Sequence, residues 1–236
     1  MAKQDRNILV GAAAVFLSRD DSLSDGWDSI VLPATVSGTP YADTLTPHAD
    51  WRNVGYTSNG VEYTYTPSYG EVEVDQLLDA AKLFKQKMTA SVKTEFAEAT
   101  LENLLVVWAQ GSSSLRYPEG DTTATDITGR TVDQTKDFNG VAVPTDEQVL
   151  GMEAGALGVE PVERQMVFVG VAPRTAVGNK KRERIYHLRR VLSVEASTHG
   201  LKRNDSTRFP VNFRLLPSEV SGAEYGTIRD RVITPA

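Results

Sequence analysis

Much of the chain alternates between apolar and polar side chains with a period of two, which is the pattern of strands that bury one face. The alternation is clearest between Val61 and Thr66 and again between Met88 and Phe96. The first run contains Val, Tyr and Thr and the second contains Val, Thr and Phe, all of which are good strand formers. We predict further strands over residues 71–75, 184–196, 209–215 and 226–233, and over 8–17 and 162–172, which contain continuous apolar runs.

Breaks in the alternation predict turns. The pair Asn59-Gly60 tolerates positive φ at both residues and predicts a tight turn before the alternating run. Pro67 and Gly70 are expected to interrupt that run, and Gly178 and Asn179 to form the turn between two later strands. Residues 76–87 fit either a helical face or a strand.

One segment changes its period from two to that of a helix. Four large apolar residues recur at i, i+3, i+4 and i+7, and so share one helical face: Leu101, Leu104, Leu105 and Trp108. Thr100 stands where an N-cap is expected, and Gly111 stands where the helix should end. We predict one short amphipathic helix that packs onto a sheet through these four residues.

Two long stretches have no sustained period and are rich in Gly, Ser, Thr and Asp, namely residues of about 18–50 and 111–160. Loops of this length are uncommon in compact domains unless they have a function. The second stretch has room for one or two short strands. No linker or repeat divides the chain, so we predict a single domain over residues 1–236. The predicted fold class is mainly β: a β-sandwich or half-barrel with one flanking α-helix and long loops.

Composition and charge narrow the function. The 236 residues include no cysteine, which excludes disulfides, thiolate metal ligands and thiol catalysis. A net charge of −6 argues against wrapping of nucleic acid. The chain has 25 Lys or Arg and 31 Asp or Glu in total. Residues 174–208 hold 10 of the basic and 3 of the acidic residues, so the rest of the chain holds 15 basic and 28 acidic residues. This asymmetry indicates either a solvated basic strand pair or complementary docking between identical copies. The apolar run at 8–17 lacks a signal-peptide cleavage site and is too short to cross a bilayer, so no membrane insertion is expected.

No residue pattern points to chemistry. The three histidines, His48, His187 and His199, lie far apart in the sequence and lack metal-ligand spacing. The acidic segment 21–26 resembles the start of a calcium loop, but Leu32 stands where the closing carboxylate is required. Glu95 and Glu98 fit a capping or intersubunit role better than acid-base work. We therefore predict a protein that is not an enzyme and has no cofactor and no metal.

Three blocks of sequence carry a resemblance. The first is Trp-x-x-Val-Gly-Tyr-Thr-x-x-Gly-Val over residues 51–61. The second runs from Glu73-Val74-Asp75-Gln76 to the helix at residues 100–104, and the third comprises residues 210–217 and 225–228. Together they resemble the major tail tube proteins of long-tailed, siphovirus-like bacteriophages. The segment 115–159 has no counterpart in that pattern.

The resemblance implies a virion structural protein, synthesised and assembled in the cytoplasm of the host bacterium. Subunits would form hexameric rings that stack into the tail tube. The tube would enclose the tape-measure protein during assembly and deliver phage DNA at infection, with tail terminator and tail tip proteins as further partners. The two long loop regions are then expected to hold contacts between rings. Whether the tail is contractile stays open. The alternatives are a head-tail joining protein, a capsid decoration protein or a carbohydrate-binding β-sandwich.

For such a tube we predict an acidic channel wall, because an acidic surface keeps DNA from adhering. The candidate lumen-facing residues are Glu62, Glu71, Glu73 and Glu95, which alternate with apolar residues and should face away from the core. Lys87 and Lys93 share the polar face with Glu95 and dilute its charge. The alternative is that these glutamates only make the outer surface soluble.

Overall fold

The computed structural model describes residues 11–19, 30, 32–48, 50–72, 82–118, 132–154, 161–175, 177–195, 197–200, 203 and 206–233. Within these residues lie ten strands and two α-helices, together with short 3-10 turns at Ser112–Ser114 and Val132–Thr135. The elements in chain order are β1 (Ala14–Ser18), α1 (Tyr41–Leu45), β2 (Trp51–Asn53), β3 (Thr57–Val72), β4 (Lys82–Phe96), α2 (Leu101–Val107), β5 (Leu115–Arg116), β6 (Val149–Leu150), β7 (Arg164–Ala172), β8 (Arg182–Ser193), β9 (Phe209–Leu215) and β10 (Gly226–Val232).

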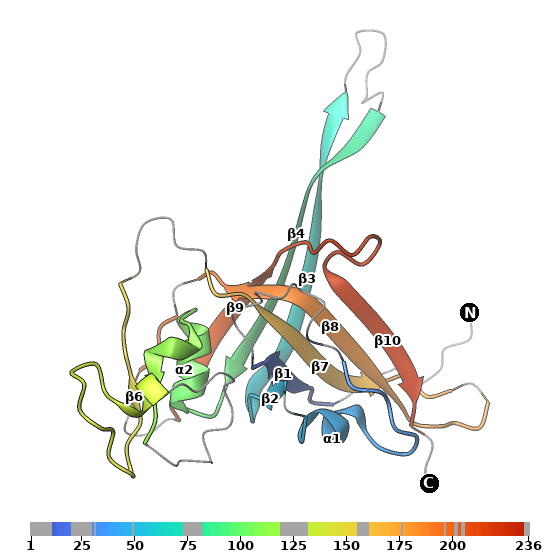
Figure 1. The fold of residues 1–236 in the computed structure, drawn as a ribbon. Coiled ribbons are helices and arrows are strands. Elements are labelled where there is room, and N and C mark those ends of the chain that lie inside the picture. The colour runs from blue at the N-terminus through green and yellow to red at the C-terminus, as the bar shows by residue number, and fades with distance from the viewer. Residues whose placement is uncertain are drawn as a thin grey trace.

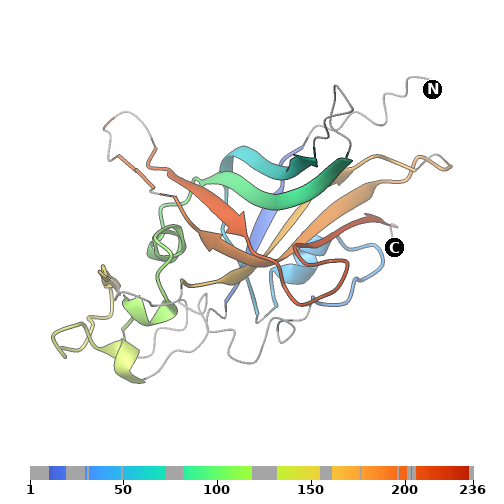
Figure 2. The same ribbon diagram turned by 90° about the horizontal axis from the view of Figure 1, so that it is seen from above.

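Eight strands form one large antiparallel sheet in the order β2-β1-β7-β8-β9-β4-β3, with β10 added to β8. One edge of β8 pairs with two strands in succession: Arg182–Leu188 pairs with β10, and Val191–Ser193 pairs with β9. The sheet therefore divides along β8, and its β9-β4-β3 part leaves the plane of β1, β7 and β8 (Figures 1 and 2).

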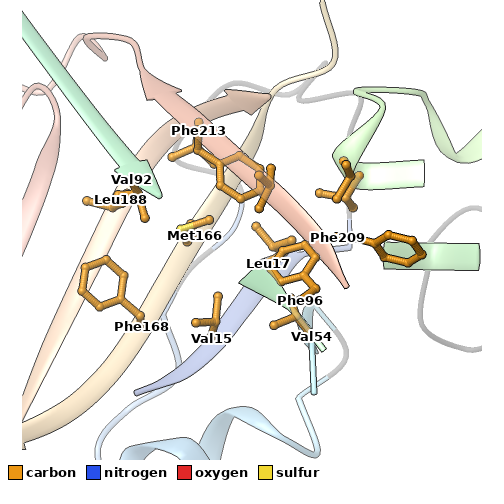
Figure 3. Packing of buried hydrophobic residues seen from close by; sticks show 14 of the residues in the cluster. Val15, Leu17, Val54, Val92, Phe96, Met166, Phe168, Leu188, Phe209 and Phe213 are labelled. Carbon is orange, nitrogen blue, oxygen red and sulfur yellow. The ribbon is translucent and has the colours of Figure 1, made fainter. Parts of the chain in front are cut away.

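The main core lies between these two parts of the sheet. Figure 3 shows side chains from both parts converging, among them Leu17, Met166 and Leu188 from one and Val92 and Phe213 from the other. All five are buried. The predicted mainly-β fold with a packed helix is confirmed, because the sheet buries one continuous face against itself and against α2.

A second core covers the opposite face of β1, β7 and β8. There Phe16 and Trp51 pack with Tyr41 and Leu45 of α1. The segment predicted to be irregular over 18–50 thus contains a short helix, while residues 20–29, 31 and 49 lie outside the described part. The amide of Tyr41 donates to both carboxylate oxygens of Glu183, at 3.0 and 3.2 Å, and Arg231 pairs with the same carboxylate. These contacts attach α1 to β8 and β10.

Helix α2 begins where the sequence predicts. The Thr100 hydroxyl accepts from the amide of Asn103 at 3.2 Å, as expected of an N-cap. Of the four predicted packing residues, Leu105 is fully buried, whereas Leu101, Leu104 and Trp108 are half-buried against the main core. No helix in the described ranges is long and apolar enough to cross a membrane.

Several predicted boundaries are wrong. The strand predicted over residues 8–17 is β1, which begins at Ala14; residues 11–13 are not part of it, and residues 8–10 lie outside the described part. Asn59 and Gly60 do have positive φ, of 60° and 72°, but they form a bulge inside β3 and do not reverse the chain. β3 also continues through Pro67 and Gly70, because a two-stranded ribbon leaves one edge free of backbone pairing and tolerates proline there.

Residues 112–118 and 132–154 form a lobe beside α2, which contains the two short strands β5 and β6. This agrees with the prediction of one or two short strands in the second long loop region. The lobe is anchored to the body, because Leu115 and Tyr117 are buried in the main core.

Candidate interaction surface

The most distinctive feature of the molecule is a two-stranded arm. β9 pairs with β4 only over Ser91–Phe96, so the outer halves of β3 and β4 pair solely with each other. Figure 1 shows this ribbon projecting far from the body. We define the arm as residues 65–72 and 82–90. A ribbon of two strands is only marginally stable in water by itself, because neither face is covered by a further layer.

One face of the arm is apolar and continuous with the main core. Successive side chains of a strand alternate between its faces. On β4, Val92 and Ala90 are fully buried, and on β3 the ring of Tyr63 lies 6.4 Å from Tyr186 of β8. The same face continues outward beyond the body, where Tyr65 contacts Tyr225 with ring centroids 6.3 Å apart.

Farther out, this apolar face has no cover within the described residues. The exposed fractions of the side chains are 52% for Tyr65, 55% for Tyr69 and 60% for Leu83. We call these three residues the arm strip. Two charged residues share this face, because Lys85 lies across from Tyr69 and Glu71 lies across from Leu83. Exposed apolar side chains that extend from a core along a projecting element are typical of interaction surfaces.

Near the body, the opposite face of the same strands is polar and of mixed charge; farther out it also carries the exposed side chains of Phe84 and Val72. It forms a shallow depression of about 400 Å³, whose lining includes Glu62, Lys87, Lys93 and Arg214 among Thr and Ser residues. Glu62 stands directly across from Lys93 in the strand register. The acidic surface predicted here is therefore interspersed with basic side chains.

The four candidate glutamates do not share one surface. Glu62 and Glu95 lie on the polar face, where Glu95 accepts from Asn59 at 2.7 Å and lies 3.9 Å from Arg208. Glu71 lies on the other face of β3 from Glu62. The register shift after Ser68 leaves Gln86 of β4 unpaired and skips no residue of β3, so Glu71 keeps the parity of Val61 and lies opposite Leu83. Glu73 lies outside the described residues.

The far end of the arm is stabilised internally by an aromatic ring. Phe84 pairs with Gly70, and a Cβ at position 70 would lie 2.6 Å from its ring. The ring of Phe84 thus covers the backbone where Gly70 has no side chain, an arrangement that compensates for glycine in a strand. Phe84 is nevertheless 45% exposed, so even this contact leaves apolar surface in water.

A polar residue that the pattern did not single out fixes the helix next to the arm's base. Asn103 is buried in α2; its side-chain oxygen accepts from Arg52 at 2.7 Å. Its side-chain nitrogen donates to the carbonyls of Val54 and Glu98, at 3.0 and 2.9 Å. The sequence did contain a signal for this role, namely a polar residue within a helix that is otherwise patterned for burial. Buried polar side chains are as a rule hydrogen-bonded, so such a residue is a candidate for a structural hydrogen-bond network.

The three histidines lie in three different parts of the structure and have different neighbours. His187 bonds Gln165 at 2.8 Å, and burial, assisted by Arg189 and Arg229, lowers its pKa to about 4. The ring of His199 packs against Trp108 and Phe209, while His48 lies 3.7 Å from Asp50. In the part of the chain that the structure describes, no three His, Asp or Glu side chains gather as metal ligands would.

Comparison with known proteins does not assign the chain to a family. No protein-family model and no curated protein matches the sequence.

Proposed function

We propose that this chain is the repeating subunit of a bacteriophage tail tube, which assembles as hexameric rings stacked into a hollow tube for DNA delivery. In this proposal it is a virion protein without enzymatic activity or cofactor. The resemblance in the three sequence blocks supplies the family. The arm strip is the structural observation that carries the proposal, because it requires a partner.

The energetic case for a partner rests on the exposed aromatic and aliphatic area. A Tyr side chain carries roughly 150–250 Å² of surface, and burial stabilises by about 25 cal/mol per Å² of apolar area. Covering Tyr65, Tyr69 and Leu83 therefore favours association by several kcal/mol before the cost of association is subtracted. A monomer leaves all of this surface in water.

The geometry favours a second copy of the chain as that partner. The arm points away from its own body (Figure 1), which leaves its strip accessible to another molecule. β3 is also the last strand of the sheet among the described residues, and its outer edge is open for pairing. A contact between two different surfaces of identical subunits repeats head-to-tail, and it generates rings or helical tubes.

Within such a tube the polar face of β3, β4 and β9 is the candidate channel wall. It carries Glu62 and Glu95, but also Lys87, Lys93 and Arg214. We propose a hydrophilic wall of balanced charge, past which DNA and the tape-measure protein move without strong binding. The tail terminator and tail tip proteins would contact the two ends of the tube.

The test is assembly of the purified protein across a concentration series, followed by sedimentation velocity and negative-stain electron microscopy. We expect rings or tubes from the wild type, and monomers from the double variant Tyr69→Ser/Leu83→Ser. Circular dichroism should show that this variant keeps its fold, because both side chains are already exposed. The matched control is Val177→Ser, since Val177 is 87% exposed but lies in the turn between β7 and β8.

A strict monomer at high concentration in several salts would refute the proposal. Closed rings that never stack would favour a head-tail joining protein. Monomers that bind glycans would favour a carbohydrate-binding β-sandwich, and attachment to preformed capsids would favour a decoration protein.

A further inference from the structure

A pocket of about 380 Å³ lies where β7 ends and β8 begins, beside α1. Most of its lining is apolar, and Val171 in that lining is 51% exposed. The charged residues of its lining are Arg174, Lys181, Arg182 and Glu183. We call this surface the basic pocket.

Two of these charges are already compensated within the subunit. The Glu183 carboxylate is buried and held by the contacts to α1 and β10, and Arg182 lies 3.8 Å from Asp230. Arg174 and Lys181 are exposed and form no ion pair with another described residue. The basic pocket therefore offers an apolar surface with two uncompensated positive charges.

The lobe has the opposite charge. Its residues 112–118 and 132–154 include five acidic and two basic residues, and one of the basic ones, Arg116, lies 4.8 Å from the ring centroid of Phe138. Asp146 and Glu147 are exposed near the start of β6, and neither has a basic partner in the described ranges. The lobe also displays an apolar side chain, Val141, which is 63% exposed.

Hydrogen bonds fix the backbone of both surfaces. In the lobe, the Asp137 carboxylate accepts from the amides of Asn139 and Val141, at 2.9 and 2.8 Å. In the turn between β7 and β8, the Thr175 hydroxyl accepts from the amide of Lys180 at 2.9 Å. Surfaces with a preformed backbone lose less conformational entropy when they bind.

The lobe and the basic pocket share no residue. Figures 1 and 2 both show the lobe and the turn between β7 and β8 on opposite sides of the body. We infer that the lobe of one copy docks on the basic pocket of the next copy, where Asp146 and Glu147 face Arg174 and Lys181. Opposite charge selects and orients such a contact.

This inference rests on the proposed function and adds a second subunit contact to that of the arm strip. Because the two surfaces differ, each bound copy keeps one of them free, and the contact repeats around a ring or along a tube. Exposed ion pairs contribute little individually, so the lobe contact strengthens an assembly that still requires the arm strip.

The experiment reverses the charge of each surface in the full-length chain. The lobe variant is Asp146→Lys/Glu147→Lys, and the pocket variant is Arg174→Glu/Lys181→Glu. All four side chains are exposed, so circular dichroism should show a wild-type fold. Each variant alone should need a concentration about ten-fold higher or more for half-assembly in sedimentation velocity, because repulsion replaces attraction.

An equimolar mixture of the two variants should assemble like the wild type. In the mixture, the lysines of one lobe face the glutamates of the other variant's pocket, and the remaining wild-type surfaces also match. A single chain with all four changes should recover for the same reason.

Two control variants should assemble like the wild type. Val177→Ser changes the turn between β7 and β8 outside the lining of the basic pocket. Glu219→Lys reverses an exposed carboxylate between β9 and β10, outside both surfaces, and so tests for an effect of net charge alone.

The outcomes separate this inference from the proposed function. If the lobe and pocket variants each assemble like Glu219→Lys, the inference is wrong and the proposed function stands. The same holds if each variant is weakened and their mixture does not recover. A wild type that stays monomeric at high concentration would overturn the proposed function and this inference together.

Discussion

Replacement of Asn103 by alanine tests how the helix is joined to the segment that leads into the arm. The side chain is 1% exposed and makes three hydrogen bonds, to Arg52, Val54 and Glu98. Alanine removes all three and leaves two backbone carbonyls and a guanidinium contact without this partner. Water has little access to this site, so the lost bonds are not replaced. A neutral hydrogen bond contributes roughly 0.5–1.5 kcal/mol and the bond to the charged Arg52 contributes more, so we expect the free energy of unfolding to fall by about 2–5 kcal/mol.

The assay is urea denaturation followed by circular dichroism, on an assembly-deficient background so that only subunit stability is measured. Asn103→Asp is the informative companion, since it keeps an oxygen toward Arg52 but loses the two donated bonds. We expect it to be destabilised as well, though less than alanine. A midpoint for Asn103→Ala within measurement error of the wild type would refute the assignment of Asn103 as the connection between α2 and β2.

Three further predictions concern the cores. Leu105→Ala should cost about 2–5 kcal/mol and Leu104→Ala clearly less, because Leu105 is fully buried and Leu104 only half-buried; denaturation of both variants measures the difference. Glu183→Ala should cost about 3–5 kcal/mol, since it leaves Arg231 without its buried carboxylate, and it should increase proteolysis near α1. Below pH 6.5 the wild type should lose up to about 1.4 kcal/mol per pH unit until about pH 4, because the unfolded chain protonates His187 before the folded one does. His187→Gln should remove this slope in denaturation curves measured from pH 7.5 to 4.5, and an unchanged slope would exclude His187 as its source.

Local pattern was sufficient where a residue's neighbours along the chain decide its structure. Alternation places β9 and the inner half of β4, a continuous apolar run places β7, and Thr100 is the N-cap before α2. Asn59 and Gly60 were recognised as residues of positive φ, yet the same φ values serve a turn and a bulge equally. Which of the two forms depends on whether β4 continues to pair beyond Val61, and that is a tertiary contact.

The sequence alone therefore determined most of the long strands, helix α2 and the absence of thiol chemistry, because periodicity and residue type act over a few neighbouring positions. It did not predict α1 or β2. Only the tertiary structure decided that β3 and β4 extend past the sheet, since this depends on where β9 stops pairing. The tertiary structure also decided that Glu71 and Glu62 lie on opposite faces of β3. Their odd spacing puts them on opposite faces only because β3 has no bulged residue between them. The arm strip consists of the same kind of residues as the core, and its exposure follows from the lack of a third strand to cover it.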